Sequence, residues 1–279
     1  MRIGLGTIIR LVPVASSLML LVRSANNGLQ VSAGLIFLGF AALAGLVGGI
    51  GWLNAKDALR GRPYWILAAS SMAMVAAVLH QPWACLAWSL VVVLAGSLLF
   101  LSSLKARFML IIGLFSVISV TGLPFSPAWL GTQVFELAVS GEGLLVKIIA
   151  VVLGLAFFSV HVLLLTGYAA LVIRGSALLP ADEQQKIVRW MWLLYIPGLA
   201  SLPVAHWLLS WTFQPEIVET PVVMWAEGAA ASAATTIWMF ASRAKWINLT
   251  RLSEKRWPAS GQIYQPLTQF LAWFFRMLA

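Results

Sequence analysis

The stretch 107–132, RFMLIIGLFSVISVTGLPFSPAWLGT, contains a long apolar run that stops at Gly122, Leu123 and Pro124. Proline has no backbone N–H and clashes with the preceding helical turn, so a helix ends or breaks here. Inside a bilayer, interrupted backbone is tolerated only where neighbouring protein or a water-filled cavity satisfies the freed polar groups. Transporters also place ions and substrates at discontinuous helices. The stretch therefore predicts a broken membrane helix, and three polar residues precede the break: Ser116, Ser119 and Thr121.

Composition places the chain among membrane proteins. Hydrophobic residues make up 61% of it and charged residues 10%, whereas a soluble domain carries about 25% charged residues. Long apolar runs favour helices over the short alternating strands of a membrane barrel. The net charge of +9 is attributed to cytoplasmic loops and not to a nucleic-acid partner. The single cysteine, Cys85, excludes a disulfide framework, and the sequence holds no metal-ligand cluster and no cofactor motif.

Apolar runs of about 20 residues, enough to cross a bilayer, predict an all-α, polytopic transmembrane helix bundle of about eight spans. The helix broken at Gly122-Leu123-Pro124 is the fifth, and a half-helix at 128–140 is expected after the break. The expected helices cover 3–22, 30–53, 63–80, 83–104, 107–123, 143–173, 187–211 and 221–242.

Lysine and arginine gather in alternate predicted loops, and Arg60 and Arg62 are assigned to the loop before the third helix. With eight crossings, all these loops fall on one side of the membrane. The positive-inside rule makes that side, with both termini, cytoplasmic in a bacterial-type inner or plasma membrane. Arg23 is an exception, because it lies between the first two predicted helices on the opposite side.

The broken helix resembles that of the antiporter-like subunits of respiratory complex I and of Mrp-type cation/proton antiporters. Its pattern in that family is G-L-P-P-x-x-G-F-x-G-K. The second proline has become Phe125 here, and the lysine has become Thr132. The positions that match are Gly122, Leu123, Pro124, the aromatic Trp129, and Gly131.

Three further stretches follow the same family in the correct order. MRIGLGTIIRL at the start resembles V-K-x-G-x-Y-x-L-L-R-L, with Arg2 on an ion-path lysine and Arg10 on an arginine. LAGLVGGIGWL, residues 67–71 and VLAGSLLFL resemble later motifs. The resemblance implies an antiporter-like half-module at 1–175. Two further transmembrane helices are expected at 176–242, and a cytoplasmic amphipathic or interfacial tail at 243–279.

Four positions depart from the relay of protonatable groups that the resemblance implies. They are Met74, Val92, Gly96 and Thr132. A proton relay needs side chains that take up and release protons, so most of the relay has been lost.

Charged and titratable residues inside the apolar runs are the candidate ion path, because such residues are costly in a bilayer. Glu227 is either a proton-carrying carboxyl or a structural partner of a basic group. Lys147 and His161, 14 residues apart on one predicted helix, would project from a similar face. They are read as a relay remnant, or as a snorkelling lysine and a histidine that bonds a neighbouring helix.

Three other charges complete the candidate path. Glu136 could replace the lysine missing at Thr132, or be an outer-face carboxylate. Arg2 and Arg10 could continue the charge row, but arginine stays protonated and cannot shuttle protons. Other polar or aromatic residues near helix ends are given ordinary roles, in wet surroundings for His80 and His206 and as interfacial anchors for Trp52, Trp83, Trp211 and Trp246.

The function that the resemblance implies is a truncated, non-catalytic subunit of an NADH:quinone oxidoreductase-like membrane arm. It would contribute to, or scaffold, proton or cation translocation beside other membrane subunits and lipids, without a cofactor of its own. Two alternatives stay open: a small stand-alone or split ion transporter or channel, and a structural subunit of another energy-conversion complex.

Overall fold

A computed structural model describes residues 2–26, 34–56, 58–101, 107–138, 144–174, 181–212 and 222–243. Within these ranges every regular element is a helix, which confirms the all-α class. The chain separates into two units, Met1–Met239 and Phe240–Ala279, and the last helix extends four residues into the second. The predicted tail at 243–279 lies, apart from Arg243, outside the described residues.

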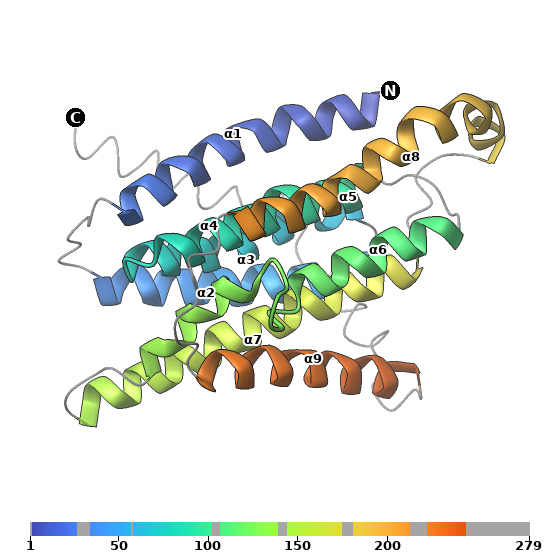
Figure 1. The fold of residues 1–279 in the computed structure, drawn as a ribbon. Coiled ribbons are helices and arrows are strands. Elements are labelled where there is room, and N and C mark those ends of the chain that lie inside the picture. Colours follow the sequence, from blue (N-terminus) through green and yellow to red (C-terminus); the bar gives the residue numbers. More distant parts are fainter. Residues whose placement is uncertain are drawn as a thin grey trace, which may run out of the picture. The chain divides into compact units, whose positions relative to one another are not determined.

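The first unit is a bundle of helices that pack side by side (Figure 1). The described part of the span predicted at 83–104 runs to Leu101 without a gap and contains a π-helical turn, η1, between α4 and α5. The elements are α1 (Arg2–Asn26), α2 (Gly34–Leu53), α3 (Ala58–Val78), α4 (Pro82–Leu90), η1 (Val91–Ala95), α5 (Gly96–Leu101), α6 (Arg107–Val120), the 3₁₀ helix η2 (Trp129–Ala138), α7 (Leu144–Arg174), α8 (Ala181–Thr212) and α9 (Val222–Arg243).

Three of the described helices are long and apolar enough to cross a membrane, which indicates a membrane protein. They are Gly34–Leu53, Pro82–Leu101 and Lys147–Ile173. Two shorter apolar helices, Leu11–Asn26 and Leu110–Val120, accompany them. A helical bundle is therefore supported, whereas the full set of eight crossings stays a prediction.

Buried tryptophans tie the helices together. The rings of Trp52 and Trp65 are fully buried, with centroids 5.1 Å apart. Each indole N–H donates to a backbone carbonyl, that of Trp52 to Leu164 at 3.1 Å and that of Trp65 to Val92 at 3.2 Å. A buried indole needs such a partner. The prediction of an interfacial anchor was therefore wrong for Trp52, because its ring fills the space between α2, α3 and α7.

The two other described tryptophans of that prediction do have exposed rings, since Trp83 is 40% and Trp211 58% exposed. Trp246 lies outside the described residues.

Helix α3 begins earlier than predicted, at Ala58 and not at 63. Arg60 and Arg62 therefore belong to a helix and not to a loop. The Arg62 side chain is only 7% exposed, and its guanidinium carbon lies 5.5 Å from the centroid of the Phe100 ring. This cation–π contact allows the charge to lie against the bundle.

The glycines of α2 allow close approach to α3, as small residues do between membrane helices. A Cβ atom at Gly48 would lie 2.8 Å from the backbone nitrogen of Ala68 and 2.9 Å from the carbonyl oxygen of Tyr64. A Cβ atom at Gly39, on the same helix, would have no neighbouring atom within 4 Å. A larger residue therefore has no space at Gly48, whereas it has free space at Gly39.

We expect Gly48→Ala to destabilise the bundle by about 1–3 kcal/mol, because the added methyl group meets rigid backbone. Gly39→Ala is the matched control and should be neutral or stabilising by up to about 1 kcal/mol, since alanine favours the helix. Thermal unfolding of both variants in one detergent measures the difference. Equal melting temperatures would contradict the α2–α3 packing.

Candidate functional site

The predicted helix break is present at the expected residues. Helix α6 ends at Val120, and the chain turns before η2 begins at Trp129. Gly122 has φ of +68°, a conformation that glycine adopts without strain. A Cβ atom there would also lie 2.8 Å from Cγ2 of Thr132 and 3.1 Å from Cε1 of His161. Leu123 and Pro124, which continue the turn, are half-buried.

Two of the predicted ion-path residues meet at this break. His161 of α7 is fully buried, and Glu227 of α9 is 6% exposed. Nδ1 of His161 lies 2.6 Å from Oε1 of Glu227. Nε2 of the same ring lies 2.9 Å from the carbonyl oxygen of Val120, the last residue of α6. The imidazole therefore connects the carboxyl group of α9 to the broken end of α6.

The hydrogen bonds around His161 define where protons can be. A carbonyl oxygen only accepts, so Nε2 must carry a hydrogen and donate it to Val120. The bond to Glu227 then holds one further proton, which lies either on Nδ1, as imidazolium beside carboxylate, or on Oε1, as neutral imidazole beside carboxylic acid. In both states the bond to Val120 persists. The pair can thus move a proton between two atoms without releasing the helix end.

Helix α9 reaches the break because it has small residues there, and Figure 1 shows it alongside α7. A Cβ atom at Gly228 would overlap the carbonyl oxygen of Gly122, so only glycine fits. The second carboxylate oxygen of Glu227, Oε2, is buried and has no hydrogen-bond partner among the described residues. The ring of Trp88 stands edge-on to His161, with centroids 5.2 Å apart.

A second buried imidazole contacts the same turn of α6 from α8. His206 is fully buried, and its Nδ1 lies 3.2 Å from Oγ of Ser119. Ser119 donates its own hydrogen to the carbonyl of Ser116 at 2.7 Å, so Nδ1 of His206 is the donor. The prediction of wet surroundings was wrong for His206, because α8 packs against α6. His80 is exposed, as expected.

Polar contacts continue from this turn to η1. The hydroxyl oxygens of Ser116 and Tyr168 are 2.7 Å apart. Tyr168, fully buried on α7, donates to the carbonyl oxygen of Ala95 at 2.8 Å. Sequence reasoning singled out the serines but missed Tyr168 and the buried role of His206. For Tyr168 and His206 the only signal in the sequence was a polar side chain inside an apolar helix. This signal does not show which groups the side chain contacts.

Packing fills the positions where the resemblance expects relay side chains. The Trp65 indole donates to the carbonyl of Val92, and a Cβ atom at Gly96 would lie 2.6 Å from its Nε1. The hydroxyl of Thr132 donates to the carbonyl of Trp129 at 2.7 Å. Met74 packs against the core cluster. At these four positions the surrounding space is occupied by aromatic, apolar or backbone groups, and none of the four residues can carry a proton.

The other ion-path candidates do not join the pair. Lys147 is exposed, and its 14-residue separation from His161 on α7 corresponds to about 21 Å along a helix. Although helical periodicity places Lys147 and His161 on a similar face of α7, Lys147 is exposed and His161 is buried. Glu136, Arg2 and Arg10 lie in helices, but their side chains are outside the described part. Among the described residues, no group of three His, Cys, Asp or Glu side chains could hold a metal ion.

No family model, curated protein or solved structure matches the chain. The resemblance to antiporter-like subunits therefore rests on the sequence motifs alone.

A double-mutant cycle tests the coupling of the pair. We expect Glu227→Ala and His161→Ala each to destabilise the bundle by about 3–5 kcal/mol, because each leaves a buried polar partner. The loss of unfolding free energy in the double variant should be smaller than the sum of the two single losses by about 0.5–3 kcal/mol. Thermal or denaturant unfolding in detergent measures all four proteins.

Thr166 and Thr235 provide the matched control cycle, since they join the same two helices through hydroxyl groups 3.2 Å apart. Valine at either position should cost about 1 kcal/mol, the usual contribution of a neutral hydrogen bond. Additive effects at Glu227 and His161 would show that the two residues do not form a pair.

Proposed function

We propose that this chain is an antiporter-like membrane subunit that carries one mobile proton between Glu227 and His161. It would contribute to proton or cation translocation within a complex I-type membrane arm. The observation that supports this most is the contact of 2.6 Å between Nδ1 and Oε1 at the broken helix. Buried carboxyl and imidazole groups are the usual components of membrane proton relays.

The geometry favours a proton function over a purely structural ion pair for two reasons. First, the carboxylate keeps one oxygen, Oε2, without a partner in the described part of the chain, although a structural pair would have both oxygens satisfied. Second, the proton lies at a helix break, where small backbone changes open or close access. The bond of Nε2 to Val120 keeps the ring in place during the transfer.

One proton position is not a complete path across a membrane. Val92 and Gly96, the positions of a charged row in the resembling family, are packed against Trp65. We therefore propose that neighbouring subunits complete the path and that this chain seals the rest of it. The proposed topology has eight crossings with both termini in the cytoplasm, and electron transfer belongs to other subunits.

Flux measurements test the role of the carboxyl group. In liposomes that contain the chain with its co-purified partners, Glu227→Gln should lower proton flux under an imposed potential by about 100-fold or more, as loss of an acid–base group does. An internal pH dye measures the flux. Ser159→Ala is the control, because its hydroxyl is exposed on the same helix as His161 and donates only to the Leu155 carbonyl. Unchanged flux in Glu227→Gln would refute the proposal.

Gentle purification of the tagged native chain tests its place in an assembly. We expect antiporter-like, quinone-reductase-like or hydrogenase-like membrane proteins to co-purify, with mass spectrometry as the readout. A chain that emerges alone, and that conducts protons alone in a Glu227-dependent way, would instead favour the stand-alone transporter.

A further inference from the structure

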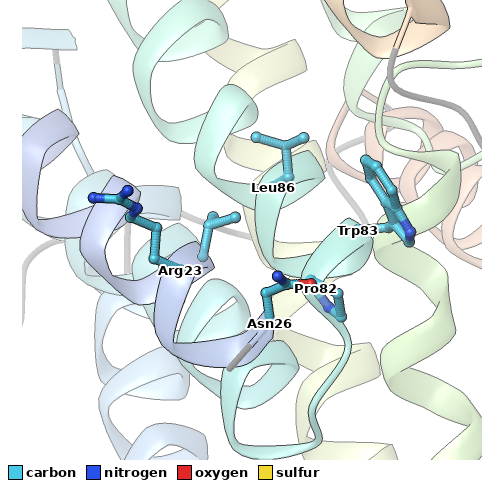
Figure 2. Close-up of a pocket in the computed structure, with 6 residues that line it drawn as sticks. Arg23, Asn26, Pro82, Trp83 and Leu86 are labelled. Carbon is cyan, nitrogen blue, oxygen red and sulfur yellow. The ribbon is translucent and has the colours of Figure 1, made fainter. Parts of the chain in front are cut away.

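An open cavity of about 590 Å³ lies between the end of α1 and the start of α4, and the residues that line it belong to these two helices. Figure 2 shows Asn26 of α1 next to Pro82 of α4, with Trp83 and Leu86 further along α4 and the Arg23 side chain on the outer side of α1. The volume lies within the range of about 300–1,000 Å³ that is typical of small-molecule sites. We propose that this cavity binds the headgroup of an anionic phospholipid, independently of any proton function.

The charge of the cavity favours an anion. Arg23 is exposed at its rim, and no described carboxylate pairs with it. None of the described residues that line the cavity is acidic. Asn26, one turn further along α1, adds an amide that can donate to a phosphate oxygen. A guanidinium at the outer edge of the cavity is suited to a phosphodiester, because its donors match two of the phosphate oxygens.

The position of the cavity favours a lipid over a soluble anion. The candidate membrane span Pro82–Leu101 begins at the cavity, which in the proposed topology places Pro82 at the bilayer surface. Trp83 is 40% exposed there, as tryptophans at the headgroup level are. Val22 and Leu86 form the apolar side of the cavity. The cavity thus offers polar groups for a lipid headgroup and apolar side chains for the adjoining glycerol and upper acyl chain.

The surface next to the cavity can accommodate acyl chains. Helices α1 and α4 pack against each other, and both run from the cavity into apolar sequence. On α1, Met19 and Leu20 are 61% and 64% exposed, and they lie about one turn before Arg23. A phosphate at Arg23 would therefore place its chains along exposed apolar side chains of α1.

This site also accounts for the exceptional position of Arg23. The other basic loops lie on the predicted cytoplasmic side, and Arg23 faces the opposite side in the proposed topology. A lipid phosphate would neutralise it there. An exposed ion pair contributes at most about 1 kcal/mol, which corresponds to about a fivefold preference for the anionic lipid.

Native mass spectrometry of the full-length chain tests the site. The detergent-solubilised protein is titrated with phosphatidylglycerol or phosphatidylcholine that carry identical acyl chains, and with glycerol phosphate as the soluble anion. We expect phosphatidylglycerol to be retained about fivefold better than phosphatidylcholine. Arg23→Ala should abolish this preference, Arg23→Lys should keep part of it, and Trp83→Leu should lower retention of both lipids.

Lys56→Ala is the matched control, because Lys56 is an exposed basic residue outside the cavity. It removes the same charge and should keep the preference. Arg23 is exposed, so its variants should melt at the wild-type temperature, and this is measured in the same detergent. Equal retention of both lipids by the wild type, an unchanged preference in Arg23→Ala, or displacement by glycerol phosphate would each overturn the proposal.

Discussion

The hydrogen bond from His161 to the carbonyl of Val120 is the contact on which the broken helix depends. The last carbonyls of a helix have no partners within it, and an unsatisfied polar group in apolar surroundings costs several kcal/mol. The Ala128 N–H satisfies the carbonyl of Ser119 at 3.1 Å, and the Thr121 hydroxyl satisfies that of Ile118 at 2.8 Å. Groups of the protein thus satisfy the last carbonyls of α6. Glu227, which contacts the His161 ring, therefore also stabilises the broken end of the helix.

The same requirement explains the large aromatic residues of the core. A π-helical turn misaligns backbone carbonyls and is often found at functional sites. In η1, the carbonyl of Val92 receives the Trp65 indole and that of Ala95 receives the Tyr168 hydroxyl. Near the break, Trp88 donates to the carbonyl of Gly131 at 3.0 Å. Aromatic donors thus supply hydrogen bonds inside the bundle without adding charge, which is the less costly arrangement in an apolar interior.

The features predicted well from sequence are those set by local chemistry. Pro124 cannot continue a helix and Gly122 permits a turn with positive φ, so the break was placed correctly at Gly122. Long apolar runs gave the helices, with ends that differ by a few residues. Glu227 and His161 were each singled out because burying a charge is costly wherever it occurs. Their pairing across 66 residues is a tertiary property that no local pattern contains.

The errors have the same origin. Trp52 and His206 were judged by their distance from a helix end, but their surroundings depend on which helix packs beside them. Arg62 was assigned to a loop because charge was taken as exposure, whereas the Phe100 ring accommodates it in α3. Lys147 shares a helix with His161, yet α7 is 31 residues long, and Lys147 near its start is exposed while His161 near its middle is buried.

The contact of Gly228 with the Gly122 carbonyl has a consequence for biogenesis. A ribosome delivers α6 and α7 to the membrane before α9, and the 66 residues between His161 and Glu227 take roughly 3–13 seconds to synthesise at about 5–20 residues per second. During that interval the imidazole has no carboxyl partner and the turn at Gly122 has no cover. The polar centre is therefore completed by a late helix, so that docking of α9 and formation of the pair are a single event.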